Sequence, residues 1–316
     1  MRALFAVSLM VLFQHAIAQD YPAREIRSIC NFAAGSGADI VVRYYSDRLA
    51  KLAGKPVVVE NKPGAQGLLA TDFLAKSKPD GYTILITPAS TTLAIAPHMF
   101  KKLPFDPVRD FDSITTLLTL SFVVAVKPDS PHKTMAEFIA FLKAKPGHGF
   151  YGTQSNSGQV AAELLKERAG LTTGYVPFKV TGDGFANLLN GNIDFMSVDS
   201  TWAATMHPTR VRILAVTSAK RNSSLPDVPS LQELGFGEFD IAPWWGVVVA
   251  AGTPRPVVSQ LAAWFNQINA SDETKQFLAR QAADAFPGTP ESMAALVRSD
   301  IERWGRYARL AKIQPQ

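Results

Sequence analysis

Hydrophobic residues follow two different spacings along the chain, and these spacings alternate. Residues 25–32, 56–60 and 82–87 are short apolar runs bounded by turn residues, a pattern typical of buried strands. Between them, residues 39–53 and 67–76 carry apolar side chains at helical spacing. Strands and helices in this order predict a parallel sheet with right-handed crossover connections.

The same alternation continues through the second half of the chain. Strands are expected over residues 122–127, 149–152, 175–178, 192–198 and 212–217, and helices over residues 134–143, 159–169 and 183–189. Thr134 and Glu137 have the spacing of a capping box at the start of one of these helices. A last strand is expected over residues 241–250, followed by helical structure from residue 256 to the end.

This pattern predicts an α/β protein made of two α/β lobes with a ligand cleft between them. We expect residues 19–122 and 246–316 to form the first lobe and residues 123–245 the second. The C-terminal helices would then return to the first lobe. A single continuous doubly wound sheet is the structural alternative.

Residues 1–18 have the organisation of a cleavable signal peptide. Arg2 gives a positive start, residues 3–13 are apolar, and Ala16-Ile17-Ala18 is a small-x-small cleavage site. The apolar run is shorter than the ~20 residues that span a bilayer. Cleavage is therefore predicted before Gln19, and the mature protein is expected in the periplasm.

Composition and charge exclude several classes of protein. Cys30 is the only cysteine, so an internal disulfide is excluded and a buried core position is expected for it. The net charge is +5, but lysines and arginines are scattered among acids, which argues against nucleic-acid binding. The histidines are not spaced as metal ligands, and no cofactor is expected.

The connection between the first strand and the first helix is unusually bare. Residues 33–38 carry no large and no charged side chain, and Asp39 follows them. In parallel α/β sheets, ligands lie beyond the carboxyl ends of the strands. The helix that begins here also presents free N–H groups and the positive end of its dipole. Ala34, Gly35, Ser36, Gly37, Ala38 and Asp39 are therefore a candidate anion site.

This turn resembles other motifs only in part. A dinucleotide fingerprint lacks its third glycine, because Ile40 stands there, and a P-loop lacks its lysine. A serine hydrolase would use Ser36 as nucleophile, but the turn follows the first strand, so no earlier loop supplies an oxyanion donor. A tight connection between strand and helix, without a ligand, is the remaining alternative.

Small polar residues follow other predicted strands as well. Ser90 and Thr91 follow one strand, Thr153, Gln154, Ser155 and Ser157 follow another, and Asp199 follows a third. Any one of these residues alone is typical of a helix cap. Together they predict a cleft that holds a small, oxygen-rich ligand by hydrogen-bond donors rather than by formal charges. An acid at position 199 is expected to organise loops and water.

Several segments, in this order, resemble one protein family. "YPAREIR", "FAAGSGAD", "GKPVVVENKPGAQG", "KPDGYTILI", "NGNIDFM" and "LAVTSAKRNSSLPDVPSLQELG" are similar to the solute-binding proteins of tripartite tricarboxylate transporters, the Bug or TctC family. The resemblance covers nearly all of the mature chain.

The resemblance implies a type II periplasmic binding protein fold and no catalysis. It implies a monomer that captures a small organic acid, a di- or tricarboxylate or an aromatic carboxylate, for the membrane permease subunits of a transporter. It also implies that residues 34–39, Ser90, Thr91, residues 153–157 and Asp199 hold the ligand. A periplasmic sensor that acts on a membrane kinase is the alternative. Trp202 and the Trp244-Trp245 pair are candidates for an aromatic wall, although core packing or the hinge is the expected role of the pair.

Overall fold

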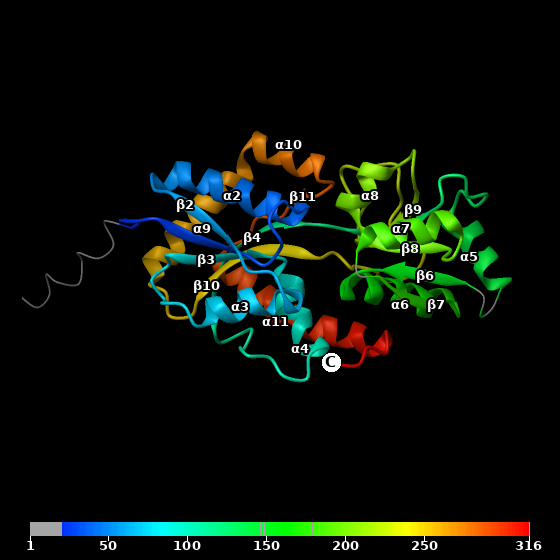
Figure 1. Cartoon of the computed structure of the whole chain (residues 1–316), viewed down its shortest axis with the longest axis horizontal. Helices are drawn as coiled ribbons and strands as arrows, with labels where there is room; N and C mark the ends of the chain where they lie inside the picture. Colours follow the sequence, from blue (N-terminus) through cyan, green and yellow to red (C-terminus); the bar gives the residue numbers. More distant parts are fainter. Residues whose placement is uncertain (1–20, 146, 148, 179, 316) are drawn as a thin grey trace, which may run out of the picture.

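The computed structural model describes residues 21–145, 147, 149–178 and 180–315. The expected signal peptide and its cleavage site before Gln19 lie outside these residues. The described chain forms two α/β bodies that lie side by side and are joined by extended segments (Figure 1). The expected two-lobe fold is therefore confirmed, and the single continuous sheet is wrong.

The first lobe is built on a mixed sheet with the order β11-β4-β10-β3-β1-β2. Its strands are β1 (Ile26–Cys30), β2 (Val57–Asn61), β3 (Thr83–Thr87), β4 (Phe111–Thr119), β10 (Trp244–Ala250) and β11 (Asp284–Ala285). The strand β1 pairs in parallel with β2 and β3, as expected, whereas β10 runs antiparallel to β3 and β4.

Helices cover both faces of this sheet, and the strand side chains alternate between them. Ile84 and Ile86 pack with α2 (Gly37–Ala53), α9 (Arg255–Ala270) and α10 (Asp272–Arg280). Leu85 packs on the opposite face with α3 (Leu68–Ala75), η3 (Ser90–Ile95) and α11 (Pro290–Leu310). This twofold alternation is the reason why the strands read as continuous apolar runs.

The second lobe has a sheet with the order β7-β6-β8-β5-β9. Its strands are β5 (Phe122–Val126), β6 (Phe150–Thr153), β7 (Gly174–Pro177), β8 (Phe195–Asp199) and β9 (Arg212–Val216). The helices α5 (Met135–Lys143) and α6 (Asn156–Ala169) pack on one face, and α7 (Thr181–Asn190) and α8 (Ser200–Met206) on the other. The capping box of Thr134 and Glu137 is confirmed at the start of α5.

The chain crosses between the sheets after β4 and again before β10. We propose these crossings as the lobe boundaries. The C-terminal helix α11 links the lobes a third time. Met293 and Val297 pack in the first lobe, whereas Trp304 joins the apolar cluster that contains Leu164 of α6.

Several local expectations were wrong. The strands β4 and β11, the helices α4 (Ala96–Met99) and α8, and the π-helical η3 were not expected. The last strand begins at Trp244 rather than at residue 241, and the C-terminal region is three helices interrupted by β11. Ile40 is 48% exposed, although Asp39 and Val41 beside it are buried, because it lies on the outer face of α2 with Arg43 and Asp47.

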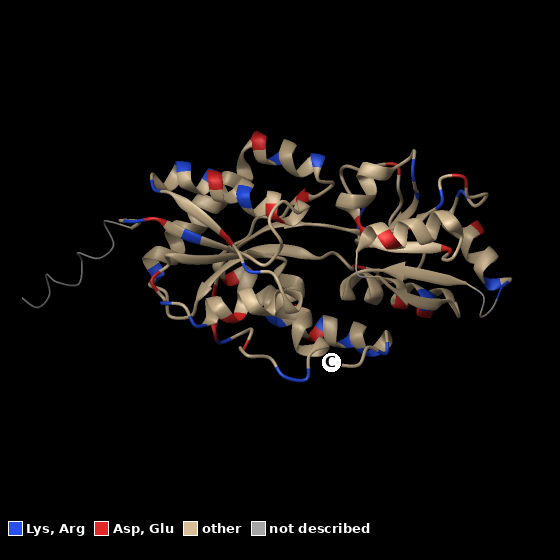
Figure 2. Cartoon of the chain, viewed as in Figure 1, with Lys and Arg blue, Asp and Glu red and all other residues tan. Residues whose placement is uncertain are grey.

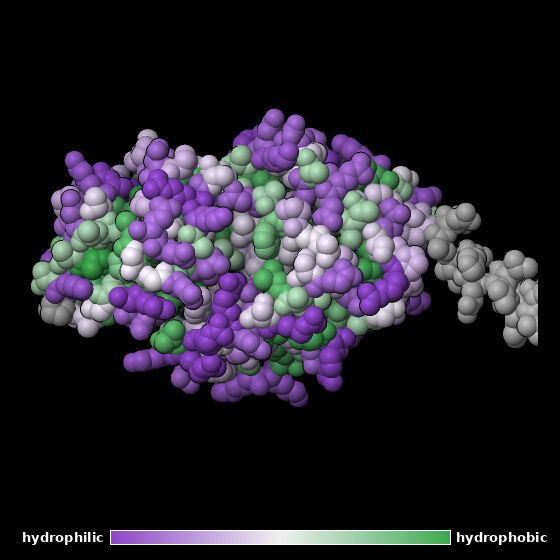
Figure 3. All heavy atoms as spheres, turned by 180° about the vertical axis from the view of Figure 1, so that it is seen from behind, coloured by the Kyte–Doolittle hydropathy of each residue, from purple (hydrophilic) through white to green (hydrophobic). Residues whose placement is uncertain are grey.

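Charges of both signs are mixed over both lobes, without a single basic face (Figure 2). Seen from behind, the surface is mainly hydrophilic, with small apolar patches (Figure 3). Within the described part of the chain, no helix combines the length and apolar character needed to cross a membrane.

A buried hydrogen bond ties α11 to the central strand of the first lobe. The indole Nε1–H of Trp244 donates to Asp300 Oδ2 at 2.7 Å, and Arg303 Nη2 lies 2.7 Å from the other oxygen. Burial raises the pKa of Asp300, against the opposing effects of Arg303 and of the bond from Trp244. The charged form of Asp300 is therefore stabilised by Trp244 and Arg303, against the effect of burial.

We predict that Trp244→Phe destabilises the protein more than Trp304→Phe does. Both indoles are 2% exposed, but the Nε1–H of Trp304 has no acceptor among the described residues, so its loss breaks no bond. The difference should be about 1–3 kcal/mol, the cost of a buried polar group left without its partner. Urea unfolding of both variants measures it, and equal losses would contradict the role assigned to the bond.

Candidate functional site

A cavity of about 550 Å³ lies between the two lobes. Its lining residues come from both sheets and from the crossing segments between them: Phe32, Gly37, Ala38, Val41, Pro88, Thr91, Leu118, Leu120, Phe122, Gln154, Ser155, Ser157, Asp199, Thr201, Trp202, Thr205, Pro243, Trp245, Gln281 and Ala283. The size is within the range of small-molecule sites, and a position at a domain interface is typical of them.

The structure brings about half of the predicted residues to this cavity. Those that line it are Gly37, Ala38, Thr91, Gln154, Ser155, Ser157 and Asp199. Those that do not are Ala34, Gly35, Ser36, Asp39, Ser90 and Thr153. The bare turn therefore meets the cavity only where it has become the first turn of α2.

The polar members of the second group are engaged in internal hydrogen bonds. Ser36 Oγ accepts from the Asp39 N–H at 3.2 Å and caps α2. Ser90 Oγ accepts from the Trp244 N–H at 3.1 Å, and Thr153 Oγ1 accepts from the Ser155 N–H at 3.3 Å. Ser90 and Thr153 are fully buried, so their hydroxyls shape the walls rather than face a ligand.

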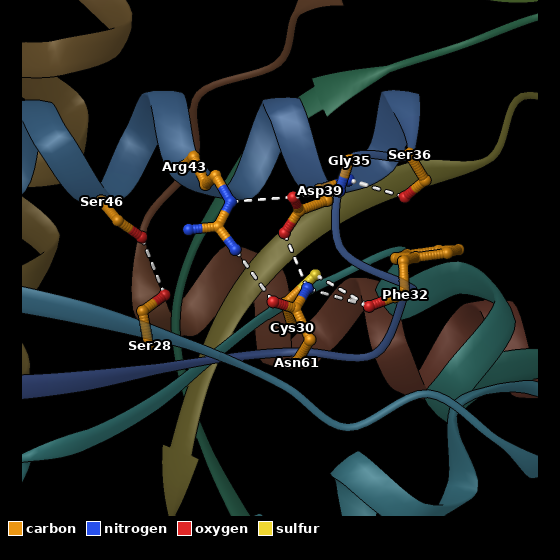
Figure 4. A network of polar contacts seen from close by, with 9 residues as sticks. All are labelled: Ser28, Cys30, Phe32, Gly35, Ser36, Asp39, Arg43, Ser46 and Asn61. Carbon is orange, nitrogen blue, oxygen red and sulfur yellow. Dashed lines mark hydrogen bonds and ion pairs between the residues drawn. The ribbon is translucent and has the colours of Figure 1, made fainter.

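Asp39 is the centre of a network that fixes the turn (Figure 4). Its Oδ2 accepts from the Gly35 N–H and from Arg43 Nε, both at 2.8 Å, and its Oδ1 accepts from Asn61 Nδ2 at 2.7 Å. Burial raises the pKa of this carboxyl, but the donors and the Arg43 charge outweigh burial and hold the pKa at about 2. Asp39 is thus a paired anion beneath the turn.

The first turns of α2 and α6 face the cavity. Their earliest N–H groups have no acceptor within a helix, and each helix dipole puts partial positive charge there. In α2 these groups belong to Gly37 and Ala38. In α6 the cap Ser155 and Ser157 of the first turn line the cavity, and Ser155 Oγ accepts from the Gly158 N–H. The two helices therefore offer donors from opposite lobes.

The two lobes also touch each other beside the cavity. Thr91 Oγ1 of η3 lies 3.5 Å from Ser157 Oγ of α6. The side chain of Asn156 donates to Gln66 Oε1 of η2 (Ala65–Gly67). These contacts hold the lobes together in the present arrangement.

An aromatic and aliphatic wall was largely missed by the sequence analysis. Phe32 stacks on Trp245, with ring centroids 5.6 Å apart and an interplanar angle of 17°. Trp202 of α8 adds a partly exposed indole from the second lobe, which makes an edge contact with Phe185. The Trp244-Trp245 pair splits, because Trp245 lines the cavity and Trp244 packs in the core, as expected.

Asp199 is the only charged side chain that lines the cavity in the described part of the chain. Its Oδ1 accepts from the Trp202 N–H at 3.0 Å and from the Thr201 hydroxyl, and so caps α8. This bonding agrees with the expected role in organising the loop. Helix α8 was not expected, because a cap and a turn look alike in the sequence.

Another groove, of about 580 Å³, lies at the outer end of the first lobe. Its cations are mostly neutralised by neighbours. Arg24 pairs with Asp80, Arg27 with Glu60, and Lys76 with Asp72. This groove is therefore a poorer anion site than the cavity between the lobes. No cluster with the makings of a metal site occurs among the described residues.

The family model for the tripartite tricarboxylate transporter family receptor, TctC, matches residues 41–312. The chain belongs to this family. The family consists of solute-binding receptors, which confirms that the chain is not an enzyme and removes the hydrolase interpretation of Ser36. A Cupriavidus necator relative, the "UPF0065 protein in gbd 5'region", is 32% identical to this receptor over 278 residues, which cover 87% of this chain and 84% of the relative.

Solved structures agree with this assignment. Rpa4515 of R. palustris with adipate has a TM-score of 0.83 and 27% identity, covering 94% of this receptor and 100% of that chain. The periplasmic binding protein BugD has a TM-score of 0.79 and 27% identity, with 94% and 100% covered. MatC of Rhodopseudomonas palustris with bound malate has a TM-score of 0.76 and 26% identity, with 90% and 99% covered.

The Asp39 network should make the stability of this TctC receptor depend on acid pH. The pKa of Asp39 is lower in the folded protein, about 2, than the ordinary value of 3.8, so the ion pair stabilises the fold above pH 4. The contribution is about 2 kcal/mol there, and about half of it is lost by pH 3.

We predict that Asp39→Asn costs about 2 kcal/mol at pH 6 and roughly 1 kcal/mol less at pH 3. Urea unfolding of both proteins at the two pH values measures the difference. A cost that stays constant or grows on acidification would contradict the paired state of this carboxylate.

Proposed function

We propose that this protein is a periplasmic receptor that binds a small organic acid in the cavity between its lobes and delivers it to the permease subunits of a tripartite transporter. The observation that carries the proposal is the pair of helix N-termini, of α2 and α6, that open into one cavity from opposite lobes. The adipate and malate complexes of the related structures support an acid as ligand. Family membership supports the transporter, and a monomer suffices for the site.

The ligand carboxylate would lie against the Gly37 and Ala38 N–H groups. Hydrogen bonds to a charged acceptor contribute roughly 1.5–3 kcal/mol each. The helix dipole adds about 0.3–1 kcal/mol, or up to ~2 kcal/mol when partly buried. Two or three such bonds supply much of the ~8 kcal/mol of a micromolar complex without an arginine or lysine.

Both lobes have to contribute if the cavity is to enclose the ligand. The Gln66–Asn156 and Thr91–Ser157 contacts form between lobes and next to the lining residues. A ligand that touches both lobes stabilises this arrangement over one in which the lobes are apart. The bound form is then the one that the permease would recognise.

A thermal-shift screen of mono-, di- and tricarboxylates and aromatic acids tests the proposal. An acid at a hundred times its Kd should raise the stability by about 2.7 kcal/mol. The ligand should be recovered unchanged. If no acid shifts the midpoint in the millimolar range, the proposed function is wrong.

We predict that Gly37→Val lowers the affinity for the best acid of the screen at least about tenfold, because the new side chain occupies the space in front of the donors. A Cβ at Gly37 meets nothing within 4 Å, so the variant should fold. Gly182→Val is the matched control: it also lies in a first helical turn with open space, but away from the cavity. Calorimetry that finds equal affinities for the two variants would place the carboxylate elsewhere.

A further inference from the structure

We infer that the ligand is a monocarboxylate with a flat apolar body and a hydrogen-bond donor at the end remote from its carboxylate. The inference rests on the proposed function and names the class of acid. It follows from two properties of the cavity: the negative charge of Asp199, the only charged side chain among the described residues that line it, and the extent of its aromatic surface.

The sign of the charge disfavours a second carboxylate next to Asp199. Asp199 lines the cavity, and no lysine or arginine among the described residues does so. The Asp199 bonds from Thr201 and Trp202 both fall on Oδ1, so Oδ2 accepts no hydrogen bond from a described residue. A negative acceptor in that position attracts a hydroxyl, an N–H or an ammonium group and repels an anion.

The donors for the carboxylate lie on other elements. Gly37 and Ala38 belong to the start of α2 in the first lobe, whereas Asp199 ends β8 and caps α8 in the second lobe. A ligand that uses both therefore reaches across the cleft, with its anionic end on α2 and its donor end on Asp199.

The surface between these ends is apolar and partly aromatic. The stacked Phe32 and Trp245 rings come from the first lobe and Trp202 from the second, with Leu118, Leu120 and Phe122 completing the wall. Aromatic faces of this kind contact a flat ring over a large area. A short hydroxy-diacid would leave this surface uncovered and put its second charge near Asp199.

Calorimetry on the mature protein tests the inference with benzoic acids that differ in one substituent. The probes are benzoate, 3- and 4-hydroxybenzoate, and the corresponding dicarboxylates isophthalate and terephthalate, with adipate as an aliphatic diacid. We expect one hydroxybenzoate to bind about tenfold more tightly than benzoate, since hydrogen bonds to charged acceptors are the stronger kind. The dicarboxylate of the same spacing should bind more weakly than benzoate.

The variant Asp199→Asn removes the charge and keeps a side chain that caps helices equally well. It should abolish most of the advantage of the hydroxybenzoate and improve binding of the dicarboxylate. Asp183→Asn makes the same change of charge at an exposed position in the first turn of α7, away from the cavity, and should leave all affinities unchanged.

The possible failures of the inference and of the proposed function differ. If adipate or a benzene dicarboxylate is the tightest ligand, or if Asp199→Asn leaves the order of affinities unchanged, the inference is overturned while organic-acid binding stands. If none of these acids, nor any acid of the screen, gives a binding isotherm, the proposed function falls as well.

Discussion

The first lobe depends on a strand that the chain reaches only after it has built the second lobe. Strand β10 lies inside the first sheet, between β3 and β4, and runs against both. The chain must therefore leave this sheet after β4 and come back to it. The two crossings meet at the same place, where Leu118, Leu120, Pro243 and Trp245 line the cavity. The position of the cavity is thus a consequence of strand order.

The charges of the first lobe are arranged so that an anion at the cavity needs no lysine or arginine beside it. Asp39 and Arg43 neutralise each other beneath the α2 turn, and Asn61 completes the pairing. An unpaired carboxylate there would oppose an anion at the helix start, so the pairing preserves the favourable dipole. Lysines and arginines are dispersed along the described parts of both lobes (Figure 2). Under the proposed function, selectivity then depends on the N–H donors of the helix starts, on the aromatic rings and on Asp199.

The sequence predicted the framework well because parallel α/β units combine two clear periodicities with turn residues. It predicted the helix start after residues 33–38 as an anion site, and Gly37 and Ala38 line the cavity. It began the helix α6 at residue 159 rather than at Asn156, and so did not identify its N-terminus. It could not separate hydroxyls that face the cavity from hydroxyls that bind the backbone. Ser90 and Thr91 are adjacent, yet Ser90 accepts from the Trp244 N–H, a partner 154 residues away in the chain.

Trp202 and Trp245 were candidates for the wall, but Phe32 and its aliphatic part were missed for a related reason. Leu118 belongs to β4, a strand that was not expected. Every residue of β10 is buried, and burial against a cavity looks the same in sequence as burial in a core. The register of β4 on β10 decides which side chains reach the crossing, and that register forms only between distant segments. Helix α8 is short, and its start resembles an ordinary polar turn.

Helix α11 gives the two lobes a shared interior. Its first half packs in the first lobe, while Trp304 and Ala311 lie in one apolar cluster with Leu164 and Leu165 of the second. Neither lobe can lose its core without exposing part of this helix. We therefore expect the two lobes to unfold together, although each has its own sheet. If they do, a ligand bound at the cleft would raise the stability of the whole chain, including the strands farthest from the cleft.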